Sequence, residues 1–176
     1  YADEAIDKAK RLSWEEADMA NTVDAMVAFK EKYGTGAYGI KTDARLDGLR
    51  YAVTSIRLEE LVLERVNVGG DRRADPDGWK IAFKAVNAGE RAAKVVKMRV
   101  VFTDEQGAII DTRPDFIATP AHPMGIPLPN AVKKTFEPGS DREIEHLIGD
   151  PNVKKGWPGD MEHLRVEVTE IEFIEG

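Results

Sequence analysis

The run from Trp79 to Asp111, WKIAFKAVNAGERAAKVVKMRVVFTDEQGAIID, constrains the fold of this chain more than any other segment. Apolar residues alternate with mostly polar ones twice, at Trp79, Ile81, Phe83 and Ala85, and again at Val96, Met98, Val100 and Phe102. Alternation with period two and one polar face is typical of half-buried antiparallel strands. The links Asn87–Glu90 and Asp104–Gly107 carry the Asn, Asp and Gly residues of tight turns. We therefore expect a meander of sequential strands without a crossover.

Length and composition are those of a folded protein. The 176 residues are 42% hydrophobic and 32% charged, without low-complexity segments. Such a chain can bury roughly two thirds of its unfolded surface, as one domain or as one domain with a helical attachment. The net charge of -7 is concentrated at the end, where ten Asp or Glu stand against four Lys or Arg from Asp141 onward. This acidic balance argues against nucleic acid as a partner.

The chain has no cysteine, which excludes disulfides and a cysteine nucleophile but leaves the compartment open. It begins at Tyr1, inside a segment that already has a helical pattern. We therefore expect that a signal peptide or membrane anchor was removed, and that the protein is extracytoplasmic, in the periplasm or cell envelope. No internal apolar run approaches the roughly 20 residues of a spanning helix, so membrane attachment is expected only through the missing N-terminus.

Residues 1 to about 56 have apolar residues every three or four positions, which predicts helices. Ser13-Trp14-Glu15-Glu16 matches a capping box, so a helix is expected to begin at Trp14. Asn21-Thr22 would restart the helix, and Gly34 with Gly36 would end it. A further helix is predicted from about residue 37 or 38 to about residue 53. Its buried face would consist of Ile40, Ala44, Leu46 or Leu49, and Val53.

One pattern in this segment combines aromatic, small and capping residues, at Trp14, Ala17, Asn21, Thr22, Ala25, Phe29, Tyr33 and Ala44. It resembles the tetratricopeptide-type helical hairpins of bacterial envelope proteins, in a single copy of about 35 residues. Gly34 stands where the repeat usually has proline. A single copy cannot form the concave groove with which repeat arrays bind peptides. The resemblance therefore implies a helical hairpin that packs on another element, such as the sheet.

From about Leu58 onward the hydrophobic period becomes that of strands. Seven strands are expected, near residues 58–68, 79–87, 94–103, 108–117, 131–137, 142–148 and 163–174. Short strands separated by turns predict a sandwich of two sheets. In the last strand Ile171 and Phe173 are out of phase with Val166 and Val168, so a β-bulge is predicted at Thr169-Glu170.

A second motif joins the turn Val86-Asn87-Ala88-Gly89 to a strand ending in Phe102-Thr103-Asp104, followed by Gly107 and Ile109-Ile110. It is similar to the immunoglobulin-like sandwich domains of bacterial lipoproteins and envelope proteins, over roughly residues 58–174. The resemblance implies an extracytoplasmic accessory or binding module and transfers no active-site residues. We therefore expect an α+β fold, with a helical hairpin in residues 1–56 and an immunoglobulin-like antiparallel β-sandwich in residues 57–176.

Three histidines, His122, His146 and His163, can act as acid or base near neutral pH. None has a metal-ligand spacing, so they are interpreted as solvated surface side chains. A hydrolase with a His and carboxylate site assembled across strands is the alternative. Asp75-Pro76-Asp77-Gly78 resembles part of a calcium loop but lacks the bidentate Glu, and a turn before a strand is the preferred interpretation.

Other catalytic motifs are missing from the sequence. There is no GxSxG, and Gly69-Gly70 is not followed by a helix with Lys and Ser. Glu167, Glu170 and Glu172 are interpreted as the charged outer face of an edge strand. The sequence therefore predicts a protein that is not an enzyme, with no catalytic residue, metal or cofactor.

The segment Arg113–Asn130 has five prolines and the apolar residues Phe116, Ile117, Met124, Ile126 and Leu128. A connection of this length is usually functional or covers an open end of a domain. Two alternatives stay open. Either Ile126 and Leu128 plug the core, or the segment is a preformed edge that binds a partner.

Trp157 stands between Gly156 and Pro158. An exposed tryptophan marks protein or sugar recognition, whereas a buried one would close the sandwich. Our first hypothesis is a non-enzymatic protein-interaction module of an envelope protein or lipoprotein, which binds another envelope protein through Phe116, Met124, Ile126 and Trp157. The alternative is a carbohydrate- or peptidoglycan-binding module that uses Trp157.

Overall fold

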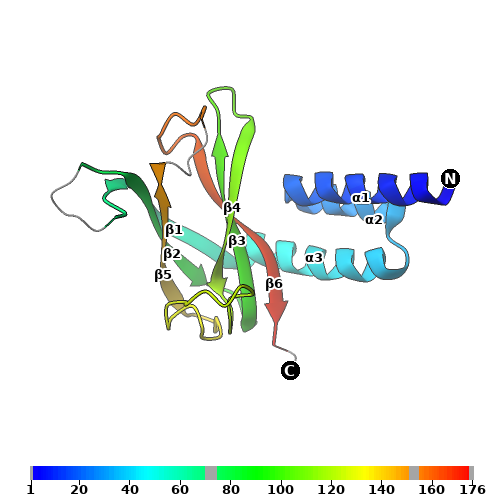
Figure 1. Ribbon diagram of the computed structural model, residues 1–176. Helices are drawn as coiled ribbons and strands as arrows, with labels where there is room; N and C mark the ends of the chain where they lie inside the picture. The colour runs from blue at the N-terminus through cyan, green and yellow to red at the C-terminus, as the bar shows by residue number, and fades with distance from the viewer. Residues whose placement is uncertain (1, 70–74, 151–154, 175–176) are drawn as a thin grey trace.

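The computed structural model describes residues 2–69, 75–150 and 155–174, in which three helices precede six strands (Figure 1). The elements are α1 (Ala2–Ala20), α2 (Val23–Tyr33), α3 (Gly36–Ser55), β1 (Ile56–Val66), β2 (Gly78–Asn87), β3 (Ala93–Thr103), β4 (Ile109–Ala118), β5 (Asp141–Gly149) and β6 (Leu164–Phe173). The protein is α+β, as expected, but its helical segment holds three helices and not a hairpin. Of the described helices, none is long and apolar enough to cross a membrane.

The first helix begins earlier than predicted. Ser13 and Glu16 lie inside α1, so the expected start at Trp14 was wrong. The preceding turns contain strong helix formers such as Ala5, Lys8 and Ala9, which carry the helix through Ser13. The helix ends at Asn21, whose φ of 52° is left-handed.

The second predicted cap is confirmed. The Thr22 side chain accepts a hydrogen bond from the Ala25 amide at 3.2 Å and caps α2. Gly34 is the C-cap of α2, as the glycine pattern predicted. The three helices share a small core around Met26 and Phe29, both fully or nearly fully buried.

The buried face of α3 differs from the predicted one. Leu46 and Leu49 are buried, but Ile40 and Val53 are 77% and 79% exposed and Ala44 is exposed. The residues that α3 buries are Gly39, Thr42, Arg45, Leu46, Gly48, Leu49 and Ala52. Hydrophobicity did not reveal this face because it includes a threonine, an arginine and two glycines.

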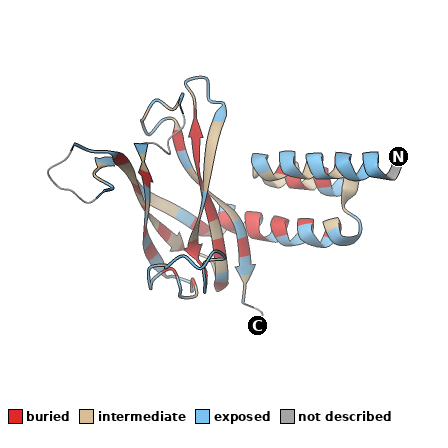
Figure 2. Ribbon diagram, in the orientation of Figure 1, coloured by how far each residue is buried: buried red, intermediate tan, exposed pale blue. Residues whose placement is uncertain are grey.

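Two three-stranded antiparallel sheets, with strand orders β1-β2-β5 and β4-β3-β6, enclose one core (Figures 1 and 2). Ile81, Phe83 and Ile144 enter it from the first sheet, and Val96, Met98, Val100, Ile117 and Leu164 from the second. Both sheets contain strands distant in sequence, so neither forms from a single hairpin.

The strand predicted at residues 131–137 is wrong. These residues form turns, with an isolated bridge between Phe136 and Ala93. Val132 and Phe136 are buried, but Lys134 between them is exposed, which breaks the alternation of a half-buried strand.

The link between β2 and β3 is not the predicted meander turn. It carries the chain from one sheet to the other, since β2 pairs with β1 and β5 while β3 pairs with β4 and β6. The reason is the buried Asn87 side chain, which accepts from the Tyr51 hydroxyl at 2.8 Å and donates to the carbonyls of Arg91 and Phe136, each at 2.9 Å. The Asp104–Gly107 link does join antiparallel neighbours, as predicted.

The predicted bulge in the last strand is confirmed. Lys97 pairs with Glu170 and Met98 with Val168, so Thr169 is the extra residue. The strand that contains it, β6, lies at the edge of its sheet, as the row of glutamates predicted.

The helices dock on the second sheet around Arg99 of β3. Its Nε donates to Glu167 at 2.9 Å, and its Nη2 donates to the main-chain oxygen of Met19 at the end of α1. Nearby, α3 lies against β6 at Gly48, where a Cβ would be 3.1 Å from the Ile171 nitrogen. The helical segment therefore forms a wall beside β6.

Candidate functional site

The residues predicted to bind a partner lie at opposite ends of the sheets. Phe116 is near the end of β4, and its ring centroid is 5.5 Å from that of His122, whose Nδ1 accepts from the Met124 amide at 3.2 Å. Ile126 follows in the same segment. Trp157 contacts Phe102 at the opposite end of the second sheet, where the segment before β6 lies in Figure 1. Partner binding by all four residues would therefore require two separate surfaces.

Residues 119–140 close one end of the core. Leu128, Val132 and Phe136 pack against it, whereas Ile126 is 52% exposed and Met124 is 80% exposed. The expected core plug is therefore correct for Leu128 and wrong for Ile126. The base of the segment is held firmly, and the tip presents two apolar side chains to solvent.

Arg142 of β5 fixes the base of this segment. Its Nη1 donates to the Ile117 carbonyl at 2.9 Å, and its Nη2 donates to the carbonyls of Lys134 and Thr135, each at 2.5 Å. Burial lowers the pKa of Arg142, but the ordinary value is so high that the guanidinium keeps its charge at neutral pH.

Trp157 is half-buried against the core. Its ring packs edge-on against Trp79 and Phe102, with centroid distances of 5.1 and 5.0 Å. Its Nε1 is buried and has no hydrogen-bond partner among the described residues. The Trp157 ring packs against the core at one end of the two sheets, so a role in partner or sugar binding stays a prediction.

All three histidines are only partly exposed, so the interpretation as solvated surface side chains holds in part. His146 on β5 donates from Nδ1 to the Asp115 carboxylate on β4 at 2.6 Å, and thereby joins the two sheets. A pocket of about 330 Å³ beside this pair is lined by Arg113, Pro114, His146, Leu147, Ile148 and Gly149. His163 pairs with Asp160 inside a turn, at 2.8 Å.

The calcium-like fragment, residues 75–78, leads directly into β2. The Asp77 carboxylate accepts a hydrogen bond from the Val68 amide at 2.6 Å, just before β2. Residues 71–74 of the same loop lie outside the described residues. Within the described part of the chain, no three His, Asp or Glu side chains gather into a set that could hold a metal ion.

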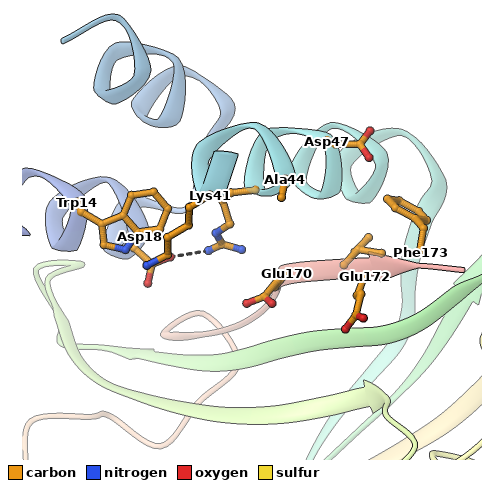
Figure 3. A pocket seen from close by; sticks show the side chains of 10 residues that line it. Trp14, Asp18, Lys41, Ala44, Asp47, Glu170, Glu172 and Phe173 are labelled. Carbon is orange, nitrogen blue, oxygen red and sulfur yellow. Dashed lines mark hydrogen bonds and ion pairs between the residues drawn. The ribbon is translucent and has the colours of Figure 1, made fainter. Parts of the chain in front are cut away.

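A cleft of about 560 Å³ lies between the helices and β6 (Figure 3). Its helical wall is formed by Trp14 and Asp18 of α1 and by Lys41, Ala44, Arg45 and Asp47 of α3. Its other wall is formed by Glu170, Ile171, Glu172 and Phe173 of β6. Positions three and four apart share one face of a helix, which explains why Lys41, Ala44 and Arg45 line the cleft together.

Arg45 is buried in this cleft, but only part of its guanidinium is paired. The side chain is 7% exposed, and Nη2 donates to Asp18 at 2.9 Å and to Asn21 at 3.0 Å. Nη1 is buried and has no acceptor among the described residues. A buried donor without an acceptor costs about 1–3 kcal/mol, and more when charged, so an acceptor bound here would stabilise the protein.

Lys41 is the second cation of the cleft. Its Nζ lies 4.0 Å from the centroid of the Trp14 ring, and it forms no ion pair with any carboxylate in the described residues. The four carboxylates of the cleft are already paired, as Asp18–Arg45, Asp47–Arg91, Glu170–Lys97 and Glu172–Lys94. The donors left without an anion are therefore Lys41 Nζ and Arg45 Nη1.

The cleft is not evident from the sequence. One signal was available. Arg45 lies on the same helical face as Leu46 and Leu49, which predicts that it is buried, and a buried arginine usually has a specific partner or role. The opposite wall comes from the far end of the chain, and local patterns do not reveal that α3 docks there.

Comparison with known proteins gives no family. No family model and no curated protein matches the chain. A solved structure described as "X-ray structure of Northeast Structural Genomics Consortium target SoR45" is similar with a TM-score of 0.29 and 13% identity, over 71% of this chain and 89% of that chain. A likeness at this level supports no conclusion about fold or function.

Proposed function

We propose that this protein is a non-enzymatic interaction module of the bacterial envelope, and that it binds another envelope protein through the tip formed by residues 122–126. The observation that carries the proposal is the 80% exposure of Met124 on a segment whose base is fixed by Arg142. The extracytoplasmic location and the immunoglobulin-like nature of the sandwich rest on the sequence resemblance. Two antiparallel sheets around one core support that resemblance in general terms.

Conformational entropy favours binding at this tip. A side chain presented by a rigid segment loses little conformational freedom on binding, so more of its contact energy appears as affinity. Pro123 and Pro127 stiffen the tip. Met124 adds an unbranched, polarizable side chain that adapts to an apolar pocket of a partner. Ile126, at 52% exposure, extends the apolar contact.

The test is site-specific photo-crosslinking in envelope extract, followed by binding measurements with the purified partner. A crosslinker at position 124 should capture one recurring protein, whereas a crosslinker at Ile40 on α3, which is 77% exposed, should not. The double substitution Met124→Ser with Ile126→Ser should weaken binding of that purified protein at least tenfold without lowering the melting temperature. Equal capture from both positions, or unchanged affinity of the double variant, would contradict the proposal.

A second candidate is a hydrolase, because His146 and Asp115 form a His and carboxylate pair beside a pocket. A histidine oriented by a carboxylate can act as a general base towards water. Ester, amide and glycoside substrates should be tested with the wild type and with His146→Gln. Turnover that disappears in the variant would support this function, and absence of turnover in the wild type would count against it.

A further inference from the structure

We propose that the cleft between the helices and β6 binds a small organic carboxylate. Its charged end would lie at Arg45 Nη1 and Lys41 Nζ, and its apolar part would lie against Ile171 and Phe173. None of the lining residues belongs to residues 119–140. The site is therefore independent of the proposed partner surface.

The charges of the cleft select an anion. Arg45 Nη1 is buried without an acceptor, and Lys41 has no carboxylate partner within the described residues. The carboxylates on the walls are each occupied by another cation. Residues 170 and 172 alternate with 171 along β6, and Figure 3 shows the carboxylates of Glu170 and Glu172 pointing away from α3. The two donors without an anion both belong to the helical wall, and the Asp18 carboxylate beside them is already paired with Arg45 Nη2.

A single negative charge fits better than a phosphate dianion. The other terminal nitrogen of Arg45, Nη2, already donates to Asp18 and Asn21. Arg45 therefore cannot form a bidentate pair of hydrogen bonds with a phosphate through Nη1 and Nη2. Arg45 Nη1 and Lys41 Nζ are two donors without an anion, a number that suits the two oxygens of one carboxylate. The nearby Asp18, Glu170 and Glu172 would repel a dianion more strongly than a monoanion.

The remaining walls of the cleft favour a ligand whose part outside the carboxylate is apolar. At about 560 Å³ the cleft is within the usual range for small-molecule sites and far larger than a carboxylate group requires. Figure 3 shows Ala44 between Trp14 and Lys41 at one end and Phe173 at the other, and Ile171 also lines the cleft. An aromatic or short aliphatic acid would bury its body there while its carboxylate reaches the two cations.

The site is held in place by contacts on both sides. Asp18 and Asn21 fix the orientation of Arg45, and Asn21 also donates to the Val168 carbonyl of β6 at 3.0 Å. Gly48 sets the separation of α3 and β6, since a side chain there would meet the Ile171 backbone. The spacing of the walls is therefore determined by the fold before any ligand binds.

The test is a titration of the ¹⁵N-labelled protein with phenylacetate, followed by NMR amide shifts and calorimetry. Saturable shifts are expected at Ala44 and Ile171, with a dissociation constant below about 1 mM, the level at which site binding becomes measurable. Phenylacetamide, which has the same body without the charge, should bind at least tenfold more weakly. Inorganic phosphate should bind at least tenfold more weakly as well.

Matched variants separate the site from the fold. Lys41→Gln should weaken phenylacetate binding at least fivefold, whereas Lys32→Gln, which removes a lysine over the Tyr33 ring outside the cleft, should leave it unchanged. Ala44→Leu, at an exposed helical position, should fill the cleft and abolish binding while the protein stays folded. Arg45→Gln should also abolish binding, but its lost bonds to Asp18 and Asn21 make Lys41→Gln the decisive variant.

Three results would overturn the proposal. Equal affinity for phenylacetate and phenylacetamide would make the cleft an apolar crevice without charge recognition. Unchanged binding by Lys41→Gln and Ala44→Leu would place the acid elsewhere on the protein. Absence of shifts at Ala44 and Ile171 up to about 10 mM acid would mean that a water molecule satisfies Arg45 Nη1 and that the cleft takes no carboxylate.

Discussion

The Nη2 atom of Arg99 lies 2.8 Å from the carboxylate of Glu167 and also donates a hydrogen bond to the main-chain oxygen of Met19. One buried guanidinium therefore joins two neighbouring strands and the end of α1. The carbonyls at a helix C-terminus lack partners within the helix and carry partial negative charge, which an arginine satisfies. Arg99 thus connects the helical segment, and with it one wall of the cleft, to the second sheet.

Arg99→Ala should lower the free energy of unfolding by about 2–4 kcal/mol, because it removes the most buried donor to Glu167 and leaves the main-chain oxygen of Met19 without its side-chain donor. Urea denaturation measures this, and hydrogen exchange should show faster opening of α1. Arg165→Ala is the matched control, since Arg165 pairs with the same Glu167 but is 49% exposed. Its cost should stay below about 1 kcal/mol. Equal costs for the two variants would contradict the role of Arg99.

The pair also predicts a pH dependence. Burial raises the pKa of Glu167, but hydrogen bonds from Arg165 and Arg99 outweigh burial and hold this pKa below its ordinary value. The unfolded chain therefore binds a proton more readily than the folded protein. The stabilisation is fully present above the unfolded value of about 4.3 and is lost as the pH falls through the lower folded value.

Accordingly, the stability difference between the wild type and Glu167→Gln should be constant from about pH 7 to 5 and shrink below about pH 4.3. Urea denaturation across this range measures the difference. The series should be repeated at high salt. Salt screens exposed ion pairs and reduces their contribution to stability, whereas the contribution of this half-buried pair should persist. A difference that grows on acidification would refute the assignment.

Asn87→Asp should destabilise the protein by about 3 kcal/mol or more. The isosteric carboxylate cannot donate to the carbonyls of Arg91 and Phe136, and it buries a charge in a fully buried position. Asn130→Asp, at an exposed position, should change stability by less than about 0.5 kcal/mol. Chemical denaturation measures the free energy of unfolding of both variants. A small loss of stability in Asn87→Asp would show that the link between the sheets does not depend on the Asn87 amide.

Arg142→Met should loosen residues 119–140 without altering Met124 or Ile126. It keeps an apolar stem in the core but leaves three carbonyls without a donor, at a cost of about 2–4 kcal/mol. Hydrogen exchange should accelerate in this segment more than in β2. The exposed Arg57→Met is the control and should leave exchange unchanged. Unaltered exchange in Arg142→Met would mean that the packing of Leu128, Val132 and Phe136 alone holds the segment.

The sequence by itself determined the features that depend on neighbouring residues. The alternation in β2 and β3, the cap at Thr22, the end of α2 at Gly34 and the bulge at Thr169 were all predicted from local patterns, because side-chain period and turn chemistry act over a few residues. The segment that contains Met124 was also singled out, although the sequence left open whether it plugs the core or presents a binding edge.

Only the tertiary structure decided the features that depend on residues far apart in the chain. These are the transfer of the chain between sheets at Asn87, the half-buried position of Trp157, the polar buried face of α3, and the cleft where Arg45 meets β6. A buried arginine or an exposed isoleucine follows from which surfaces dock, and docking is selected by the sum of many long-range contacts that no local pattern contains.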